Sequence, residues 1–301
     1  MTAAPTTTRS GFVALAGRPN VGKSTLVNAI VGRKVAIVSD KPQTTRRAIR
    51  GVATRNGAEQ LVLVDLPGVQ KPLDGLTARM QARVERELRE TDVALMVLNA
   101  QQGIGPGDRW IAKALENASC PVVIAVNKID RIHRPRTVEL LQEAVDLGIA
   151  DDVFPISARG GDGVEALADH LFSLLPEGPL MYAVDDHSDL AFHVQLAELI
   201  REQVLRRTFE EVPHAVEVVI EDLNDDREDL TVITAKVWVE TESQKGILVG
   251  SQGKMVRAIG TAARKELERE VGTQVHLDLV VRVRRGWRGD EGLLDRLGFD
   301  D

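Results

Sequence analysis

Five short apolar runs in the first 160 residues alternate with amphipathic stretches, and this alternation constrains the fold more than any other feature of the chain. Each run holds four to six mostly aliphatic residues, which is typical of strands buried on both faces of a parallel sheet. Strands that alternate with helices predict an α/β domain with a doubly wound, mainly parallel sheet. We expect the strands at 12–16, 61–64, 93–98, 122–126 and 153–156, and the helices near 23–31, 77–90, 107–117, 137–147 and 163–174.

The rest of the chain has a different order of elements. A length of 301 residues favours two domains, and prolines and glycines at 176–179 mark a linker between them. Beyond the linker the pattern predicts a smaller α+β domain. We expect a disordered tail at 1–10, domains at 11–176 and 189–301, and a linker at 177–188. The expected elements of the second domain are a helix at 189–208, strands at 215–220 and 230–239 around an acidic turn at 221–229, helices at 246–249 and 254–270, and a strand at 275–284.

Composition narrows the class of protein. With 43% hydrophobic and 28% charged residues the chain resembles an ordinary soluble protein. Its net charge of −7 argues against a protein that coats nucleic acid with a generally basic surface. A single cysteine excludes an internal disulfide and fits a reducing compartment. No apolar run approaches the roughly 20 residues that span a bilayer, and residues 1–10 lack the apolar segment of a secretory signal. We therefore expect a cytoplasmic protein without a transmembrane segment.

The segment between the first predicted strand and helix matches GxxxxGK[ST], the pattern of phosphate-binding loops. Its glycines would let backbone N–H groups surround a phosphate, and the helix that follows would direct its positive end at that phosphate. Lys23 would neutralise the β- and γ-phosphate oxygens, and Ser24 would be a ligand of Mg²⁺. The residues predicted to contact a nucleotide here are Gly17, Arg18, Pro19, Asn20, Val21, Gly22, Lys23, Ser24 and Thr25.

Two later segments would complete a magnesium and γ-phosphate site. The pattern DxxG is made by Asp65, Leu66, Pro67 and Gly68. Asp65 directly follows an apolar run, so its carboxylate would emerge at the carboxyl edge of the sheet and hold Mg²⁺ through water, while the Gly68 N–H would meet the γ-phosphate. In the polar loop after the first helix, a threonine would complete the Mg²⁺ coordination, and we prefer Thr45 to Thr44 as that ligand.

The loops after the last two strands would recognise a base. In the segment Asn127, Lys128, Ile129 and Asp130, the buried Asp130 carboxylate would accept hydrogen bonds from the guanine N1–H and exocyclic amine. Adenine offers neither donor, so it would leave that carboxylate unpaired. Lys128 would pack its stem on the base, and Asn127 would tie loops together. In the segment Ser157, Ala158 and Arg159, a small residue would let a backbone N–H reach the guanine O6.

These five segments occur in the order and at the strand ends that GTPases share. The first domain therefore resembles the GTPase superfamily, and its Arg-Pro-Asn and Gln-Thr-Thr-Arg segments resemble those of the Era branch. The resemblance implies that the chain binds GTP or GDP with Mg²⁺ and hydrolyses GTP to GDP and phosphate.

Two residues bear on how GTP would be hydrolysed. Val69 stands where Ras-like proteins place a glutamine that orients water, so catalysis would depend on Mg²⁺, Lys23, Thr45 and the Gly68 N–H. We expect slow intrinsic turnover that a partner could accelerate. Asn20 resembles the residue that helps to hold K⁺ in related potassium-dependent GTPases, which favours K⁺ as a further cofactor over an ordinary turn asparagine.

A second signature lies in the smaller domain. Gly250, Ser251, Gln252 and Gly253 fit the GxxG loop of KH domains, between a short apolar helix and a long amphipathic one. Lys254 and Arg257 follow it, and residues 244–288 carry 10 Lys and Arg against 4 Asp and Glu. Glycine corners allow the close approach of phosphates, and these cations would attract them. We expect a single RNA strand in a narrow groove walled by the strand near 275–283, and we expect Trp287 to pack in a core.

With this second domain the resemblance to the Era family extends from about residue 10 to 299. It implies a type II KH domain, binding to the 3′ end of small-subunit (16S) ribosomal RNA and assistance in assembly of the 30S subunit. It also implies a monomer in the cytoplasm, with peripheral membrane association in some members. This chain departs from the family in its acidic 221–229 segment and its Ser-Gln loop centre, where a basic residue is common.

Three other functions fit parts of the sequence. The chain could be a constitutive RNA-binding assembly factor whose nucleotide domain is a relic, although intact Lys23, Asp65 and Asp130 argue against this. It could be an Era-related GTPase with a different RNA target. A P-loop ATPase or metabolic kinase is the third alternative, and Asp130 is the residue that discriminates against it.

Overall fold

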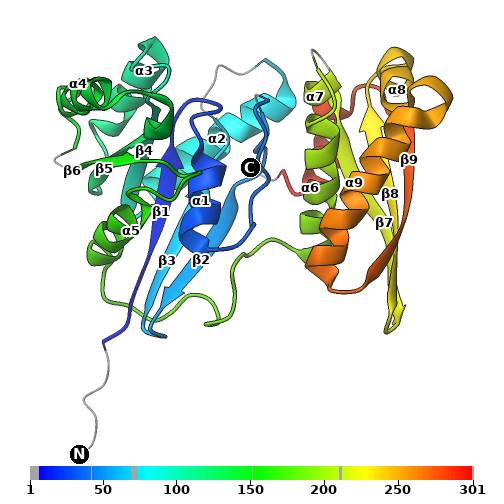
Figure 1. The fold of residues 1–301 in the computed structure, drawn as a ribbon, viewed down its shortest axis with the longest axis horizontal. Coiled ribbons are helices and arrows are strands. Elements are labelled where there is room, and N and C mark those ends of the chain that lie inside the picture. The colour runs from blue at the N-terminus through cyan, green and yellow to red at the C-terminus, as the bar shows by residue number, and fades with distance from the viewer. Residues whose placement is uncertain (1–6, 42, 69–72, 151, 210–211, 300–301) are drawn as a thin grey trace, which may run out of the picture.

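A six-stranded sheet forms the centre of the N-terminal domain (Figure 1). Its strand order is β2-β3-β1-β4-β5-β6, and every neighbouring pair is parallel except β2 and β3. The computed structural model describes residues 7–41, 43–68, 73–150, 152–209 and 212–299. The strands are β1 (Arg9–Ala16), β2 (Ile49–Arg55), β3 (Glu59–Asp65), β4 (Val93–Asn99), β5 (Val122–Asn127) and β6 (Asp152–Ile156).

Helices cover both faces of this sheet because the strands bury aliphatic side chains on both sides. α1 and α5 share one core with β1, β3 and β4, and α3 and α4 share the opposite core with β4 and β5. α2 packs through Val84 against Ala14 and Val64. The prediction of a doubly wound, mainly parallel α/β domain is confirmed. The helices are α1 (Lys23–Val31), α2 (Gly75–Arg89), α3 (Pro106–Leu115), α4 (Arg134–Val145) and α5 (Val164–Ser173).

Two features of this domain differ from the sequence prediction. β2 was not expected, because its run is interrupted by Gly51 and two arginines; it is held as an antiparallel edge strand by its register with β3. The expected tail at 1–10 extends too far, since Arg9 and Ser10 belong to β1 and pair with Glu59 and Gln60. Residues 1–6 of that expected tail lie outside the described residues.

The chain between α5 and α6 (Phe192–Leu205) is bonded to the N-terminal domain along its course (Figure 1). Glu177 bridges to Arg9, and Ser188 bridges to Gly51. The Gln60 side-chain oxygen accepts hydrogen bonds from two successive backbone N–H groups of this segment at 2.8 and 2.9 Å. The segment predicted as a linker is therefore fastened to the sheet over much of its length.

The C-terminal domain is a three-stranded sheet in the order β7-β8-β9, with β7 and β8 antiparallel and β8 and β9 parallel. α6, α8 and α9 pack on one core with this sheet. The predicted α+β order is confirmed. Its elements are α6 (Phe192–Leu205), α7 (Val212–Ala215), β7 (Glu217–Arg227), β8 (Leu230–Val239), α8 (Glu242–Val249), η2 (Ser251–Gly253), α9 (Lys254–Val271), β9 (Gln274–Val283), η3 (Trp287–Gly289) and α10 (Glu291–Arg296). A further short helix, η1 (Ile129–Arg131), belongs to the N-terminal domain and lies between β5 and α4.

The acidic segment at 221–229 is not the turn that we expected. Most of it continues β7 to Arg227, and only two residues form the turn before β8. Two register shifts, after Ile220 and after Asn224, accommodate the segment on the sheet edge. Its acids are largely exposed there, so hydrogen bonding to β8 outweighs the weak strand preference of Asp and Asn.

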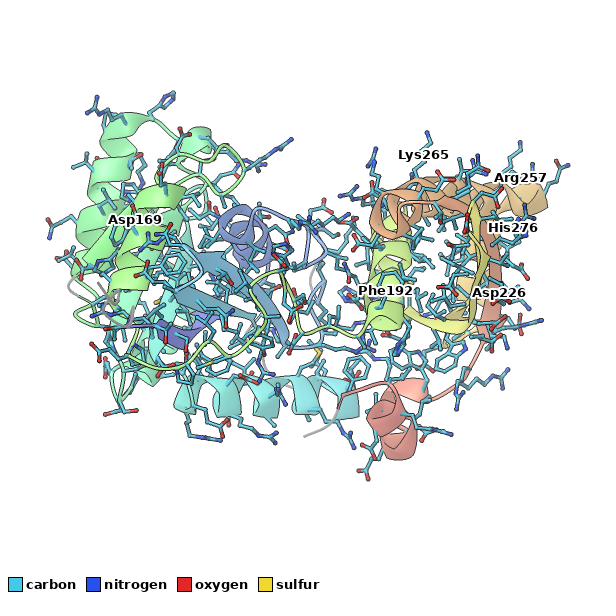
Figure 2. The ribbon with its side chains drawn as sticks, turned by 90° about the horizontal axis from the view of Figure 1, so that it is seen from below. Asp169, Phe192, Asp226, Arg257, Lys265 and His276 are labelled. Atoms are coloured by element: carbon cyan, nitrogen blue, oxygen red, sulfur yellow. The ribbon has the colours of Figure 1, made fainter. Side chains whose placement is uncertain are left out.

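One contact between the two domains lies at the N-terminal end of α2. Trp287 is fully buried in one cluster with Leu76 and Met80 of α2 and with Leu293 and Leu294 of α10. Its ring N–H donates to the carbonyl of Ala215 at 3.1 Å. Figure 2 shows α2 running along one side of the N-terminal domain toward α10. The prediction that Trp287 packs in a core is confirmed, and the core that it joins lies between the domains.

Candidate functional site

Lys23, the first residue of α1, directs its side chain back into the turn between β1 and α1. Lys23 Nζ donates to the carbonyls of Gly17 at 3.0 Å and Arg18 at 3.2 Å. Burial lowers the pKa of Lys23 to about 8, because desolvation outweighs the opposing effect of the Asp65 charge. Gly22 has a φ of +103°, which favours glycine. A phosphate in this turn would replace the two carbonyls as the partner of the ammonium group.

Three oxygen-bearing side chains converge beside this lysine. Ser24 Oγ lies 2.6 Å from Asp65 Oδ2 and 3.0 Å from Thr45 Oγ1, and the Thr45 hydroxyl lies 3.1 Å from the same carboxylate oxygen. Thr44 instead donates to the carbonyl of Lys41 at 2.6 Å. The three residues predicted as metal ligands are thus brought together, and the alternative threonine is not among them.

The chemistry of this cluster fits Mg²⁺. Hydroxyl and carboxylate oxygens are the ligands that Mg²⁺ prefers. Among the described residues no hydrogen-bond donor reaches the buried Asp65 Oδ1. Burial raises the pKa of Asp65 above its ordinary value, although Lys23 and the two hydroxyls act in the opposite direction. A cation bound here would pair the orphaned oxygen and keep the carboxylate ionised.

Gly68 brings the end of the DxxG segment to the phosphate loop. A Cβ built on Gly68 would lie 2.8 Å from backbone and side-chain atoms of Pro19, so only glycine fits this approach. Leu66 and Pro67, between Asp65 and Gly68, are buried. Val69 lies outside the described residues.

Asn127 joins the phosphate loop to the two segments expected to bind a base. Its Nδ2 donates to the carbonyl of Val21 at 2.9 Å, and its Oδ1 accepts from the N–H groups of Lys128 at 2.8 Å and Ala158 at 2.9 Å. A Cβ on Gly22 would lie 2.3 Å from Asn127 Nδ2, so the phosphate-loop glycine is also needed for this junction. The four segments therefore meet on one side of the sheet.

One of the residues expected to bind the base differs from the sequence prediction. Asp130 is exposed and not buried, because it sits in the short turn η1 at the rim; its Oδ1 accepts a hydrogen bond from Ser157 Oγ at 2.7 Å. In the segment 157–159, the Ala158 N–H donates to Asn127 Oδ1 at 2.9 Å. Lys128 Nζ donates to the carbonyl of Asn20 at 2.6 Å, and burial, followed by the charge of Arg131, lowers its pKa.

The predicted contact set includes two arginines, one of which pairs with an acid outside the phosphate loop. Arg18 Nε lies 2.8 Å from the buried carboxylate of Asp108, which caps the start of α3. A nucleotide would therefore meet the backbone of Arg18 and not its guanidinium group. Arg159 is exposed. Seven of the other predicted contacts line one cleft together with Ile37, Val38 and Ser39, which the sequence did not single out: Pro19, Asn20, Gly22, Lys23, Ser24, Thr25 and Gly68.

The C-terminal domain has a groove on the face of α9 and β9. It has a volume of about 480 Å³ and is lined on the helix side by Val256, Arg257 and Gly260, and on the strand side by Val275 and Leu277 among others. Figure 2 labels Arg257 and His276, two residues of this groove, on the side of the domain that faces away from the N-terminal domain. Its lining combines the apolar side chains of Val256, Val275 and Leu277 with the cations Arg257 and Arg264, and single RNA strands bind surfaces of this mixed kind.

The GxxG loop stands at one end of that groove. Gly250 and Gly253 have φ values of +70° and +74°, and a Cβ on Gly250 would lie 2.8 Å from the Cβ of Met255. Ser251 and Gln252, between the glycines, are exposed. Lys254 and Arg257, on the first turn of α9, are also exposed. The six residues predicted to contact RNA form one continuous surface.

Two families of known proteins match the two domains. The family described as "50S ribosome-binding GTPase" matches residues 12–128, and the KH domain family matches residues 211–288. Among the described residues no helix is long and apolar enough to cross a membrane.

The chain is similar over nearly its full length to proteins named GTPase Era. It is 45% identical to that of Caldanaerobacter subterraneus over 293 residues, covering 97% of this chain and 98% of the relative. It is 44% identical to that of Mycobacterium avium over 297 residues, covering 97% and 99% of the two chains.

Two solved structures share the whole fold. One is a crystal structure of Era in complex with MgGDPNP and nucleotides 1506–1542 of 16S ribosomal RNA, at 33% identity and a TM-score of 0.92, covering 98% of this chain and 100% of that one. The other is a variant of Aquifex aeolicus Era bound to GDP and AlF4−, also at 33% identity and a TM-score of 0.92. These likenesses span the nucleotide cleft, the GxxG loop and the junction between them, and the chain belongs to the Era family of GTPases.

Proposed function

We propose that this Era-family GTPase binds GTP with Mg²⁺ in the cleft formed by the loops that begin at Gly17, Asp65 and Asn127, and hydrolyses it slowly. The observation that carries the proposal is the direct bonding of these loops through Ser24 to Asp65 and Asn127 to Val21. When bound, Mg²⁺ would neutralise charge on the transferring phosphate. Lys23 would add positive charge, and the Gly68 N–H would orient the γ-phosphate.

Purified protein tests this directly. GTP should be converted to GDP and phosphate in the presence of Mg²⁺, and ATP should compete weakly. ATP that competes with GTP at equal affinity would support the ATPase or kinase alternative. Loss of GTP binding in Lys23→Met, with the folded state retained, would connect the activity to the phosphate loop.

K⁺ is the proposed further cofactor. Support comes from Asn20, which lines the cleft and whose Nδ2 donates to the carbonyl of Asp40 at 2.6 Å. If the amide rotates, its Oδ1 would stand beside that carbonyl, and two oxygens would face one cation. Hydrolysis should be faster in KCl than in NaCl, and Asn20→Ala should remove the difference. Equal rates in the two salts would contradict the proposal.

The proposed RNA ligand is the 3′ region of 16S ribosomal RNA, bound as a single strand in the groove between α9 and β9. A relative of the same fold was crystallised with nucleotides 1506–1542 of that RNA. The acidic edge of β7 would repel a duplex, whereas the GxxG loop, Lys254 and Arg257 would hold phosphates. We further propose that this binding assists assembly of the 30S subunit.

The nucleotide is proposed to control this binding. The two relatives with the same arrangement of both domains hold MgGDPNP or GDP with AlF4−, which resemble the triphosphate and its transition state. Ordering of the loops at 39–48 and 68–78 by γ-phosphate and Mg²⁺ would be the two-state element. Crosslinking to RNA in cell lysate with a GTP analogue or GDP tests this: the 16S 3′ terminus should be enriched only with the analogue.

A constitutive RNA-binding assembly factor would give a different result. Its crosslinks would be the same with either nucleotide, and Lys23→Ala would leave 30S assembly unaffected. An Era-related GTPase with another target would show nucleotide-dependent crosslinks to a different RNA. We propose a monomer in the cytoplasm with peripheral membrane association, which cell fractionation and light scattering would test.

A further inference from the structure

α6 lies on the side of the C-terminal domain that faces the N-terminal domain (Figure 1), and its residues from Leu196 to Leu205 are all buried. One side contributes Leu196, Ile200 and Val204 to the core of the C-terminal domain. The other side carries Glu198, Arg201 and Glu202, which are also buried. Buried charges are rare unless they are paired, so their partners identify what this helix contacts.

The partners belong to the loop that carries Thr45. Arg201 Nη2 donates to the carbonyl of Thr44 and pairs with Glu198 at 2.6 Å. Arg47 contacts Glu198 at 3.1 Å and Glu217 at 3.2 Å. We call Arg46, Arg47, Glu198, Arg201 and Glu217 the clasp.

Arg46 is the most deeply inserted member of the clasp. Its Nη1 lies 2.9 Å from Glu217 Oε2 and 2.5 Å from the carbonyl of Val216, and its Nη2 donates to the carbonyl of His214 at 2.9 Å. The side chains of Arg46 and Glu217 are 0% and 1% exposed. A side chain from the N-terminal domain is thus bonded wholly within the C-terminal domain.

A second contact set holds the start of the same loop. The Val38 N–H donates to Glu202 Oε1 at 2.9 Å, and Lys34 Nζ pairs with Glu202 Oε2 at 2.6 Å. Val38 and Thr45 both line the nucleotide cleft. The C-terminal domain therefore contacts this part of the chain near Val38 and again at the residues on either side of Thr45.

We propose that Arg201 and Glu217 are positioning residues for the GTPase site, which hold Thr45 at the Mg²⁺ position and so make the metal-ligating loop and the docked C-terminal domain one state. This inference rests on the proposed function, and it assigns the contacts through which the nucleotide site and the C-terminal domain would affect each other. Thr45 is one residue from both Thr44 and Arg46, so the loop cannot withdraw Thr45 from Ser24 and Asp65 without straining the clasp.

The coupling must act in both directions. A ligand shifts an equilibrium only by its differential affinity for the two states. If γ-phosphate and Mg²⁺ favour the docked loop, they favour the clasp, and the clasp in turn favours GTP over GDP by the same factor. Weakening the clasp should therefore reduce the preference for GTP without a similar loss of affinity for GDP.

The test uses full-length Glu217→Gln and Arg201→Met. We expect the affinity for a non-hydrolysable GTP analogue with Mg²⁺ to fall about tenfold, the affinity for GDP to change less than twofold, and the half-saturating Mg²⁺ concentration to rise about tenfold. Asp189→Asn is the matched control, because it removes an ion pair with Arg50 that does not touch the 39–48 loop. It should leave all three values unchanged.

Hydrogen exchange at the Val38 amide provides a readout on the unaltered protein, should the variants fail to fold. The amide should exchange more slowly with the GTP analogue than with GDP, and the two rates should converge in Glu217→Gln. Equal rates in the unaltered protein, or variants that keep the full preference for GTP, would overturn the proposal. An unaltered protein that does not bind GTP at all would instead overturn the proposed function.

Discussion

Arg46 Nη1 of the N-terminal domain lies 2.9 Å from Glu217 Oε2 of the C-terminal domain, across 171 positions of sequence. Both side chains are buried, and such pairs usually add little net stability because desolvation offsets their attraction. However, a buried pair of this kind requires a strict geometry, because either charge without its partner would destabilise the protein strongly. The pair is therefore better suited to select one arrangement of the domains than to stabilise the fold.

Acid should weaken this interface. Burial raises the pKa of Glu217, but Arg47, Arg46 and Arg201 outweigh it and bring the pKa below the ordinary value of 4.5. Because the folded-state pKa is depressed, the contribution of Glu217 to stability is complete above about pH 4.5 and is lost as the pH falls through the folded-state value.

Urea unfolding between pH 3 and pH 6 measures this contribution. The free energy of unfolding should decrease below about pH 4.5 more steeply in the unaltered protein than in Glu217→Gln. Parallel pH profiles would show that the pKa of this carboxyl is the same in the folded and unfolded states, which would contradict its depression by the arginines.

Asp130→Asn should change the base that is recognised. The amide presents a donor where guanine requires an acceptor for its exocyclic amine, and xanthine has a carbonyl at that position. We expect GTP affinity to fall about 100-fold and XTP affinity to rise, on the basis of about 1–3 kcal/mol for each unpaired group. Fluorescent-nucleotide titration with GTP, XTP and ATP measures this, and unaltered GTP affinity would remove Asp130 from the base site.

Thr45→Val and Thr44→Val form a matched pair. Valine keeps the shape of threonine and removes the hydroxyl, which in Thr45 faces Ser24 and Asp65 and in Thr44 faces the carbonyl of Lys41. We expect Thr45→Val to lower Mg²⁺-dependent affinity for a GTP analogue about tenfold, roughly the worth of one hydrogen bond to a charged group. Thr44→Val should change it less than twofold, and the opposite outcome would make Thr44 the ligand.

Trp287→Ala should destabilise the protein by about 3–5 kcal/mol, the usual cost of truncating a buried tryptophan. Trp287 is fully buried between α2 and α10, and its ring N–H donates a hydrogen bond to the carbonyl of Ala215. Trp110→Ala is the control: its side chain is 56% exposed, and its loss should cost within about 0.5 kcal/mol. Free energies of unfolding in urea compare the two, and equal values would contradict the packing role.

Arg257→Ala should weaken RNA binding and reduce its salt dependence. A side chain that neutralises one phosphate of a single strand contributes about 0.7 to the slope of log affinity against log salt. Arg269→Ala is the control on the same helix, since Arg269 is far along α9 and pairs with Glu266. Titration of a 16S 3′ oligonucleotide at several salt concentrations measures both slopes, which should differ only for Arg257.

The position of the nucleotide loops at the ends of strands could be predicted from the sequence alone. Gly17, Gly22 and Gly68 stand where a Cβ would collide with a neighbouring segment, and each loop directly follows an apolar run that became a strand. Such features depend on the order of residues over short distances, because strand and helix periods and glycine geometry are local properties. The GxxG loop, set between two helices, was recognisable for the same reason.

The contacts between the two domains could not be predicted from local sequence patterns. Glu198, Arg201, Glu202 and Glu217 look like ordinary charged residues of a solvated surface, and only the tertiary structure shows that they are buried against the loop around Thr45. The same holds for Trp287, whose core is shared with α2, more than 190 positions earlier. A charge becomes a buried partner only when a distant segment removes its water, and no local pattern in the chain records where that segment will lie.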